Sequence, residues 1–299
     1  MAEPMAKLGD REPRVAVALG GGGARGLAHI AALEALDELG VRPVAIAGTS
    51  MGAIVGAAYA AGASGKELRA YALSRLRDRA QVMARVLQAR VGRIADLFSR
   101  GVGNPVLIDG EKLLDLFWPE IVPDDIEDLP IPFQAVATDY FARCEHRFDA
   151  GPLVTAVAAS MAIPGLVRPV LAGGRVYVDG GAVNPLPFER LGDDGAIVVA
   201  VDVTGGPTTA VRVAPEPFEA MLGASQIMQG AIVAEKLKAR APDVLVRPAV
   251  DAFRGLDFFK TKAILLAAEP AKEQLKRDLA ARLERPAPAA VSGARRRSS

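Results

Sequence analysis

A serine between two glycines is the residue of this chain best suited to nucleophilic chemistry. The segment Gly48-Thr49-Ser50-Met51-Gly52 follows the apolar run 44–47 and opens a helical pattern over 50–61. A G-x-S-x-G sequence between a strand and a helix is typical of a nucleophile elbow, because glycines on either side leave room for the crossing backbone. The positive end of the following helix favours negative charge at the serine. We therefore predict that Ser50 is a nucleophile.

A second glycine-rich turn lies between the apolar run 15–19 and a helical pattern over 24–39. Its G-x-G-x-x-G spacing also occurs in dinucleotide-binding loops, which need a carboxylate at the end of the next strand. Here that strand ends in the serine turn, although Arg25 could meet a phosphate, so nucleotide binding stays open. The alternative is an oxyanion hole, whose N–H groups stabilise charge on a carbonyl oxygen. Its predicted residues are Gly21, Gly22, Gly23, Ala24, Arg25 and Gly26.

A serine nucleophile needs a base, and the chain has only two histidines. His29 falls inside the first helical pattern and His146 inside a polar segment, and neither follows the chain order of an α/β-hydrolase triad. The best carboxylate is Asp179, which ends a short apolar run and enters a glycine turn. The structural alternative for Asp179 is an ordinary Asp-Gly turn.

Apolar runs alternate with helical patterns along the chain. This alternation predicts an α/β layered fold with a largely parallel sheet, whose ligand site lies at the carboxyl ends of the strands. Both glycine turns come at such ends. The expected strands are 15–19, 44–47, 133–138, 175–178, 196–203 and 244–246. The expected helices are 24–39, 50–61, 110–117, 152–160, 217–240 and 258–284.

One arginine-rich segment interrupts this alternation. Seven arginines and two aspartates lie between Arg75 and Arg100, together with apolar residues at roughly helical spacing. One interpretation is an amphipathic helix packed on the core. The other is a lid or interfacial segment, within 64–105, that meets anionic lipid through 75–100.

Composition excludes several other classes of protein. The 299 residues are 51% hydrophobic and 24% charged, as in globular domains, and a net charge of +1 does not suggest a nucleic-acid partner. One cysteine and two histidines make neither an internal disulfide nor a zinc site, so we expect no metal or cofactor. Residues 1–13 lack the apolar core of a secretory signal, and the uncharged stretch 43–65 fits a strand, turn and buried helix better than a membrane span. We therefore expect a cytoplasmic protein.

Four motifs in this order resemble the patatin-like phospholipase family. Ala137-Thr138-Asp139 after a strand is also similar to bacterial members, although Phe141-Ala142-Arg143 stands where those members usually carry Thr-Gly. The four motifs are Gly21-Gly22-Gly23-Ala24-Arg25-Gly26, Gly48-Thr49-Ser50-Met51-Gly52, Ala159-Ser160-Met161-Ala162-Ile163-Pro164 and Asp179-Gly180-Gly181.

The resemblance, which covers about Arg14 to Val203, implies a three-layer α/β/α fold and a Ser-Asp dyad without histidine. Carried over, Ser50 is the nucleophile, Asp179 the general base, and the glycine loop the oxyanion hole. We expect a catalytic domain over 14–203 and a mixed α/β part over 204–285 packed on the same domain. The ends, 1–13 and the basic tail 286–299, are expected to be disordered.

Three functions remain open at this point. The first is hydrolysis of acyl esters of lipids or phospholipids through Ser50 and Asp179. The second uses the same dyad for acyl transfer or thioester cleavage, with Arg25 near a phosphate-bearing carrier. The third is a nucleotide-binding or regulatory module without hydrolysis. The protein partners and the oligomeric state do not follow from the sequence.

Overall fold

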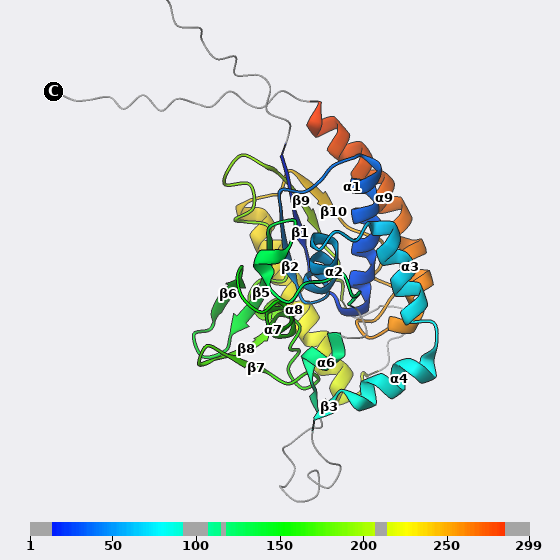
Figure 1. The fold of residues 1–299 in the computed structure, drawn as a ribbon, viewed down its shortest axis with the longest axis vertical. Helices are drawn as coiled ribbons and strands as arrows, with labels where there is room; N and C mark the ends of the chain where they lie inside the picture. The colour runs from blue at the N-terminus through cyan, green and yellow to red at the C-terminus, as the bar shows by residue number, and fades with distance from the viewer. Residues whose placement is uncertain (1–13, 92–106, 115–117, 207–213, 285–299) are drawn as a thin grey trace, which may run out of the picture.

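The structure is a computed structural model that describes residues 14–91, 107–114, 118–206 and 214–284. Its centre is one mixed sheet, in which five neighbouring strands run parallel to one another (Figure 1). These strands are short and mostly apolar because helices or loops cover both faces of the sheet. In spatial order they are β10 (Val244–Val246), β9 (Ile197–Val201), β1 (Val15–Leu19), β2 (Ala45–Thr49) and β5 (Phe133–Asp139).

The remaining strands pair antiparallel: β6 (Cys144–Phe148) and β8 (Arg175–Asp179) with β5, and β7 (Val170–Ala172) with β8. Because β6 covers residues 135–139 of β5, strands β2 and β8 must share the opposite edge of β5. On that edge β2 pairs with residues 133–136 and β8 with residues 137–139, in opposite directions. The carboxyl ends of β2 and β8 therefore meet head to head.

Helices of the first layer cover one face of the sheet, and Figure 1 shows α1 and α9 along one side of it. Side chains on alternate strand positions, such as Val15, Val17 and Leu19, point into this layer. The helices are α1 (His29–Glu38), preceded by the short 3-10 helix η1 (Gly23–Ala28), α2 (Met51–Ala60), α3 (Gly65–Arg75), α7 (Leu153–Ser160) and α9 (Thr261–Leu283).

The other face of the sheet is covered by helix α8 (Pro217–Ala239) and by a chain segment that contributes Leu186 and Phe188. The intervening strand positions, among them Ala16 and Ala18, point to this side. The small side chains allow the covering segment to approach the sheet closely. The predicted three-layer α/β/α fold is thus confirmed, with a sheet that is partly antiparallel.

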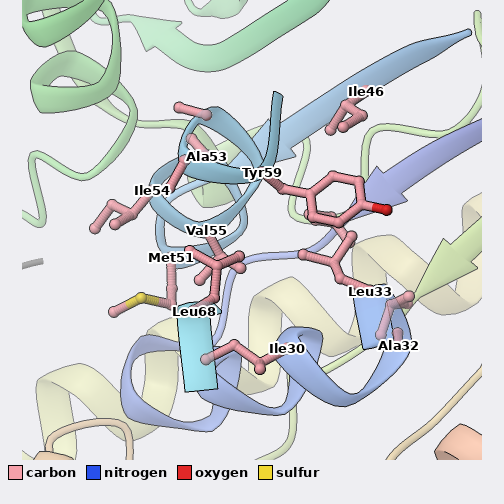
Figure 2. Close-up of a cluster of buried hydrophobic side chains, with 14 of the residues drawn as sticks. Ile30, Ala32, Leu33, Ile46, Met51, Ala53, Ile54, Val55, Tyr59 and Leu68 are labelled. Atoms are coloured by element: carbon pink, nitrogen blue, oxygen red, sulfur yellow. The ribbon is translucent and has the colours of Figure 1, made fainter. Parts of the chain in front are cut away.

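The helix that follows Ser50 lies in the middle of the first layer. All ten residues of α2 are buried, and Figure 2 shows Met51 and Val55 packed toward Ile30 of α1 and Leu68 of α3. Burying each such aliphatic side chain contributes roughly 1.5–3 kcal/mol. This packing fixes the axis of α2 and hence the position of its first residue.

The uncharged stretch 43–65 forms β2, a turn and α2, as expected. No helix in the described part of the chain is long and apolar enough to span a bilayer.

The segment 64–105 does not continue as one helix, and the amphipathic helix predicted as one interpretation of 75–100 is shorter than that range. Its described part contains α3, α4 (Arg79–Gln88) and the two-residue strand β3 (Arg90–Val91), while 92–106 lies outside the described residues. Helix α3 begins with a capping box, in which Ser64 and Glu67 satisfy each other's backbone N–H groups. That Ser-x-x-Glu signal was present in the sequence.

The chain beyond 204 adds to the same sheet and to the same core. Strand β10 pairs with β9, and α9 packs against α1 through buried residues that include Ile264, Leu265 and Leu275. Strand β4 (Leu107–Ile108) pairs with β3, and α6 (Gly110–Leu114) follows it. The predicted tails, 1–13 and 286–299, lie outside the described residues.

Candidate active site

Ser50 occupies a strained turn between β2 and α2. Its backbone has φ 54° and ψ −119°, a conformation that L-residues with a side chain rarely adopt. A Cβ at Gly48 would lie 2.5 Å from the carbonyl oxygen of Gly52, and a Cβ at Gly52 would lie 2.1 Å from that of Leu19. Both glycines are therefore required by the close crossing of the backbone, as a nucleophile elbow demands.

A second serine anchors this turn from behind. The Ser160 hydroxyl, at the end of α7, donates to the carbonyl oxygen of Val136 at 2.6 Å and accepts the backbone N–H of Ser50 at 2.9 Å. Ser160 is fully buried. The sequence placed Ser160 only within a family-like motif, and its role as the anchor of the elbow follows from the tertiary structure.

The head-to-head arrangement of β2 and β8 brings Ser50 beside Asp179. The Ser50 side chain lies close enough to the Asp179 carboxylate to lower its pKa, and this carboxylate accepts the backbone N–H of Gly181 at 2.7 Å. Both side chains are nearly buried. A Cβ at Gly180 would lie 2.1 Å from the carbonyl oxygen of Val136, so only glycine fits directly after the aspartate.

The environment of Asp179 makes its carboxyl a stronger base than an exposed one. Burial raises its pKa from 3.8 to about 6, while the hydrogen bond from Gly181 and the nearby Ser50 hydroxyl oppose the rise. A base with a pKa near the working pH transfers protons efficiently and is still largely ionised at neutral pH. The arrangement can therefore deprotonate a hydroxyl at its centre.

The glycine loop lies over Ser50, and a Cβ at Gly21 would be 3.5 Å from the Ser50 Cβ. Two of its N–H groups are already used: Gly21 donates to Pro185 at 2.8 Å and Ala24 to Gly255 at 2.7 Å. Within the described part of the chain, the N–H groups of Gly22 and Gly23 have no acceptor. Of the six predicted residues, Gly21 and Ala24 are thereby excluded as donors to an oxyanion, while the N–H groups of Gly22 and Gly23 are free among the described residues.

The Arg25 side chain holds the loop in place. It is fully buried, and its guanidinium donates to the carbonyl oxygens of Thr204 at 2.5 Å, Phe253 at 3.3 Å and Gly206 at 3.4 Å. Burial lowers its pKa, and Asp251 and Asp202 oppose this shift. This geometry uses the guanidinium within the fold and does not support the hypothesis that Arg25 holds a phosphate.

Neither histidine reaches Ser50. His29 is fully buried in α1, with its Nε2 2.7 Å from the carbonyl oxygen of Gly20, and burial lowers its pKa to about 4. His146 stacks against Phe148 and Tyr177 on the far edge of β5. It lines a separate cavity of about 870 Å³ that does not contain Ser50. Among the described residues, no group of three or more His, Cys, Asp or Glu could hold a metal ion.

A pocket of about 110 Å³ joins the serine, the aspartate and the glycine loop. Helix α8 forms its opposite wall and presents Leu222, Ser225, Gln226 and Gln229. The Gln229 amide lies close to the aspartate turn, because a Cβ at Gly181 would be 2.7 Å from its Nε2. The sequence predicted helix α8 but did not place it at the site.

Asn184 connects the elbow, the aspartate turn and α8. Its carbonyl oxygen accepts the Thr49 hydroxyl at 2.8 Å, and its N–H donates to Gly180 at 2.8 Å. Its side chain accepts a hydrogen bond from Lys236 of α8 and donates to Glu145 of β6. Lys236 also pairs with Glu189. We call Asn184, Glu145, Lys236 and Glu189 the polar clamp. No motif of the sequence predicts this cluster.

A model of one protein family, described as patatin-like phospholipase, matches residues 17–191, which include Ser50, Asp179 and the glycine loop. The chain belongs to the patatin-like phospholipase family. An uncharacterised NTE family protein of Mycobacterium tuberculosis is 40% identical to it over 205 residues, 68% of this chain and 53% of the relative. The chain thus spans about half the length of the mycobacterial relative that it matches.

Other relatives share the family name. Patatin-like phospholipase domain-containing protein 7 of Rattus norvegicus is 35% identical over 194 residues, which are 63% of this chain and 13% of the relative. Among solved structures, VipD from Legionella pneumophila aligns with a TM-score of 0.48 and 15% identity, covering 90% of this chain and 67% of VipD.

Proposed function

We propose that this family member is a serine hydrolase that cleaves acyl esters of lipids, with Ser50 as nucleophile and Asp179 as general base. The observation that carries the proposal is the placement, in one pocket, of a serine on a strained elbow beside a buried carboxylate whose pKa is raised to about 6. The family supports a lipid as the substrate class.

In the acylation step, the Ser50 Oγ attacks the carbonyl carbon of the ester while Asp179 accepts the hydroxyl proton. The electron pair of the C=O bond moves to the oxygen, and the N–H groups of Gly22 and Gly23 stabilise the resulting oxyanion. One such donor contributes roughly 3–4 kcal/mol to transition-state stabilisation. When the tetrahedral intermediate collapses, the C–O bond to the alcohol breaks and the alcohol leaves with the proton from Asp179.

Deacylation repeats these steps with water. Asp179 removes a proton from a water molecule that attacks the acyl carbon, and the same two N–H groups stabilise the second oxyanion. The bond to Ser50 Oγ then breaks, Oγ recovers the proton, and the fatty acid leaves. The positive end of α2, which begins at Met51, favours negative charge at Oγ in both steps.

The proposal is tested by hydrolysis of p-nitrophenyl butyrate with the wild type, Ser50→Ala and Ser74→Ala. Ser74 is an exposed serine of α3 and serves as the matched control. We expect Ser50→Ala to lose at least a thousandfold in kcat/KM and Ser74→Ala to keep the wild-type value. A fluorophosphonate should label the wild type at Ser50.

Activity that survives in Ser50→Ala would show that Ser50 is not the nucleophile. A wild type that neither turns over the ester nor reacts with the fluorophosphonate would contradict a serine hydrolase of any kind. Release of fatty acid from phosphatidylglycerol vesicles then tests the lipid substrate class directly.

A further inference from the structure

Helix α4 exposes apolar side chains among arginines that form no ion pair with a described carboxylate. Of its ten residues only Val82 is buried, and Met83 and Leu87 are 49% and 53% exposed. From Arg75 to Val91 the chain has five arginines and one aspartate, and that aspartate, Asp78, caps α4. No described carboxylate pairs with the five arginines, which are Arg75, Arg77, Arg79, Arg85 and Arg90.

Helix α8 also leaves apolar side chains exposed, although it lines the pocket. Val233 is the only buried residue among its 23. In its first turns Phe218 and Met221 are 40% and 45% exposed, and further along Ile227 and Met228 are exposed still more. One side of α8 therefore lines the pocket while apolar residues elsewhere on it face solvent.

A chain of contacts connects these two helices around the pocket. The guanidinium of Arg79 lies 5.3 Å from the ring centroid of Phe259, in the short 3-10 helix η4 (Phe258–Lys260). Shortly before η4, Arg254 pairs with Glu219 of α8 at 2.6 Å, and the exposed Leu256 lines the pocket itself. Figure 1 shows α4 at the lower end of the molecule.

We propose that α4, η4, residues 254–256 and the first turns of α8 form one docking surface for an anionic lipid bilayer. Exposed apolar side chains together with unpaired cations are the combination that binds an anionic interface, since the apolar groups enter the acyl boundary and the cations meet the headgroups. The excess of arginine makes the surface complementary to anionic lipid in charge. The role of this surface in bringing substrate to the enzyme rests on the proposed function, lipid hydrolysis.

The docking surface adjoins the pocket that contains Ser50. Leu256 belongs to the docking surface and to the lining of the pocket, and α8 contributes to both. A bilayer bound here would therefore lie next to the opening of the Ser50 pocket. An ester could pass from the bilayer to Ser50 along the side of α8 without crossing bulk water.

The test is binding of full-length Ser50→Ala protein to phosphatidylglycerol and to phosphatidylcholine vesicles, measured by sedimentation. The Ser50→Ala background prevents hydrolysis from changing the vesicles. We expect binding to phosphatidylglycerol that weakens with salt, and much weaker binding to phosphatidylcholine. Arg77→Gln/Arg85→Gln should weaken binding about fivefold for each arginine removed, and Met83→Ser/Leu87→Ser at least tenfold.

Matched controls are exposed residues that lie outside the proposed docking surface. Ile121 is 54% exposed beside Gly62, which follows the C-terminal end of α2, and Arg277 lies exposed in the last turns of α9. Ile121→Ser and Arg277→Gln should bind phosphatidylglycerol vesicles as the parent does. Equal losses in the controls and in the surface variants would overturn the proposal, as would a parent protein that does not bind these vesicles.

Hydrolysis of p-nitrophenyl butyrate without vesicles separates this inference from the proposed function. With Ser50 restored, the four surface substitutions should leave this soluble activity unchanged. Vesicle binding without soluble activity would preserve the docking surface and refute the hydrolase. Soluble activity without vesicle binding would support the hydrolase and refute the docking surface.

Discussion

At the scale of single residues, the property that matters most is the raised pKa of Asp179. The carboxyl is buried, and the hydrogen bond from Gly181 and the nearby Ser50 hydroxyl offset only part of the cost of its charge. The same burial that makes it a useful base also makes the ionised form costly to fold. Activity and stability should therefore depend on pH in opposite directions.

The first prediction concerns the pH profile of ester hydrolysis. Because the ionised form of Asp179 is the base, kcat/KM should rise with pH through about 6 and then level off. His146→Gln should give the same profile, since His146 stacks on Phe148 and Tyr177 away from Ser50. A midpoint that moves with the His146 substitution would point to a histidine base.

The second prediction concerns Asp179→Asn. Folding raises the pKa of Asp179, so ionisation costs stability, and the free energy of unfolding of the wild type should fall as pH rises from about 4 to about 6. Asparagine cannot ionise. At pH 8 the variant should be more stable by up to about 3 kcal/mol, and below pH 4 the two should be equal.

Urea unfolding at both pH values measures this difference, with the exposed Asp149→Asn as the control. The Asp179→Asn variant should also lose at least a thousandfold in kcat/KM. A variant that keeps its activity would exclude Asp179 as the base, whatever its stability.

At the scale of elements, α8 is held mainly near its C-terminal end. Val233 packs under the sheet, and Lys236 joins the polar clamp through Asn184 and Glu189. Asn184 in turn holds Thr49, directly before the serine, and Gly180, directly after the aspartate. The clamp therefore links the pocket wall to both reactive residues.

The third prediction compares two lysines of this helix. Lys236→Ala leaves partly buried carboxylate and amide groups without their cation, so we expect a loss of about 3 kcal/mol in the free energy of unfolding. Lys238, 71% exposed and paired with Glu235, should cost less than about 1 kcal/mol when changed to alanine. Equal losses would show that the clamp does not stabilise the fold.

At the scale of the whole molecule, the hydrophobic core extends beyond the part of the chain that the family model matches, which ends at residue 191. Strands β9 and β10 complete the parallel array, and α9 covers α1 with buried side chains at Ile264, Leu265, Leu275 and Leu279. Two carboxylates of α1 are also tied to α9: Glu34 and Glu38 both pair with Lys272.

The fourth prediction follows from this shared core. A chain that ends at residue 206 would expose the α9-facing side of α1. The four large side chains of α9 would each forfeit roughly 1.5–3 kcal/mol, about the whole stability of an ordinary domain. We expect no cooperative thermal unfolding and no ester hydrolysis, whereas a chain that ends at residue 284 should retain both. A folded, active 206-residue chain would contradict this account.

The sequence was sufficient for the elements whose local signals are strong. The strand over 15–19 was predicted from a continuous apolar run, and the helix after Ser50 from the spacing of the glycines around it. The structure contains both elements. The expected helix over 24–39 instead divides into η1 and α1, because Gly23 and Gly26 fit a tight turn close to Gly255 and Met51. Helix α3 was missed although its capping box could be read from Ser64 and Glu67.

The sequence by itself determined the chemical groups: a serine with a glycine two positions before it and another two positions after it, an aspartate before two glycines, and a loop of glycines after a strand. The spacing identifies them, because a Cβ at Gly48, Gly52 or Gly180 would clash with backbone oxygen atoms of the turns. The tertiary structure alone decided how they meet. An apolar run in the sequence does not show which strands pair or in which direction. Only the strand pairing shows that β2 and β8 run toward each other on β5 and bring Ser50 to Asp179. Only packing shows that α8 forms the opposite wall, because its contacts with Gly181 and Gly255 lie far away in sequence.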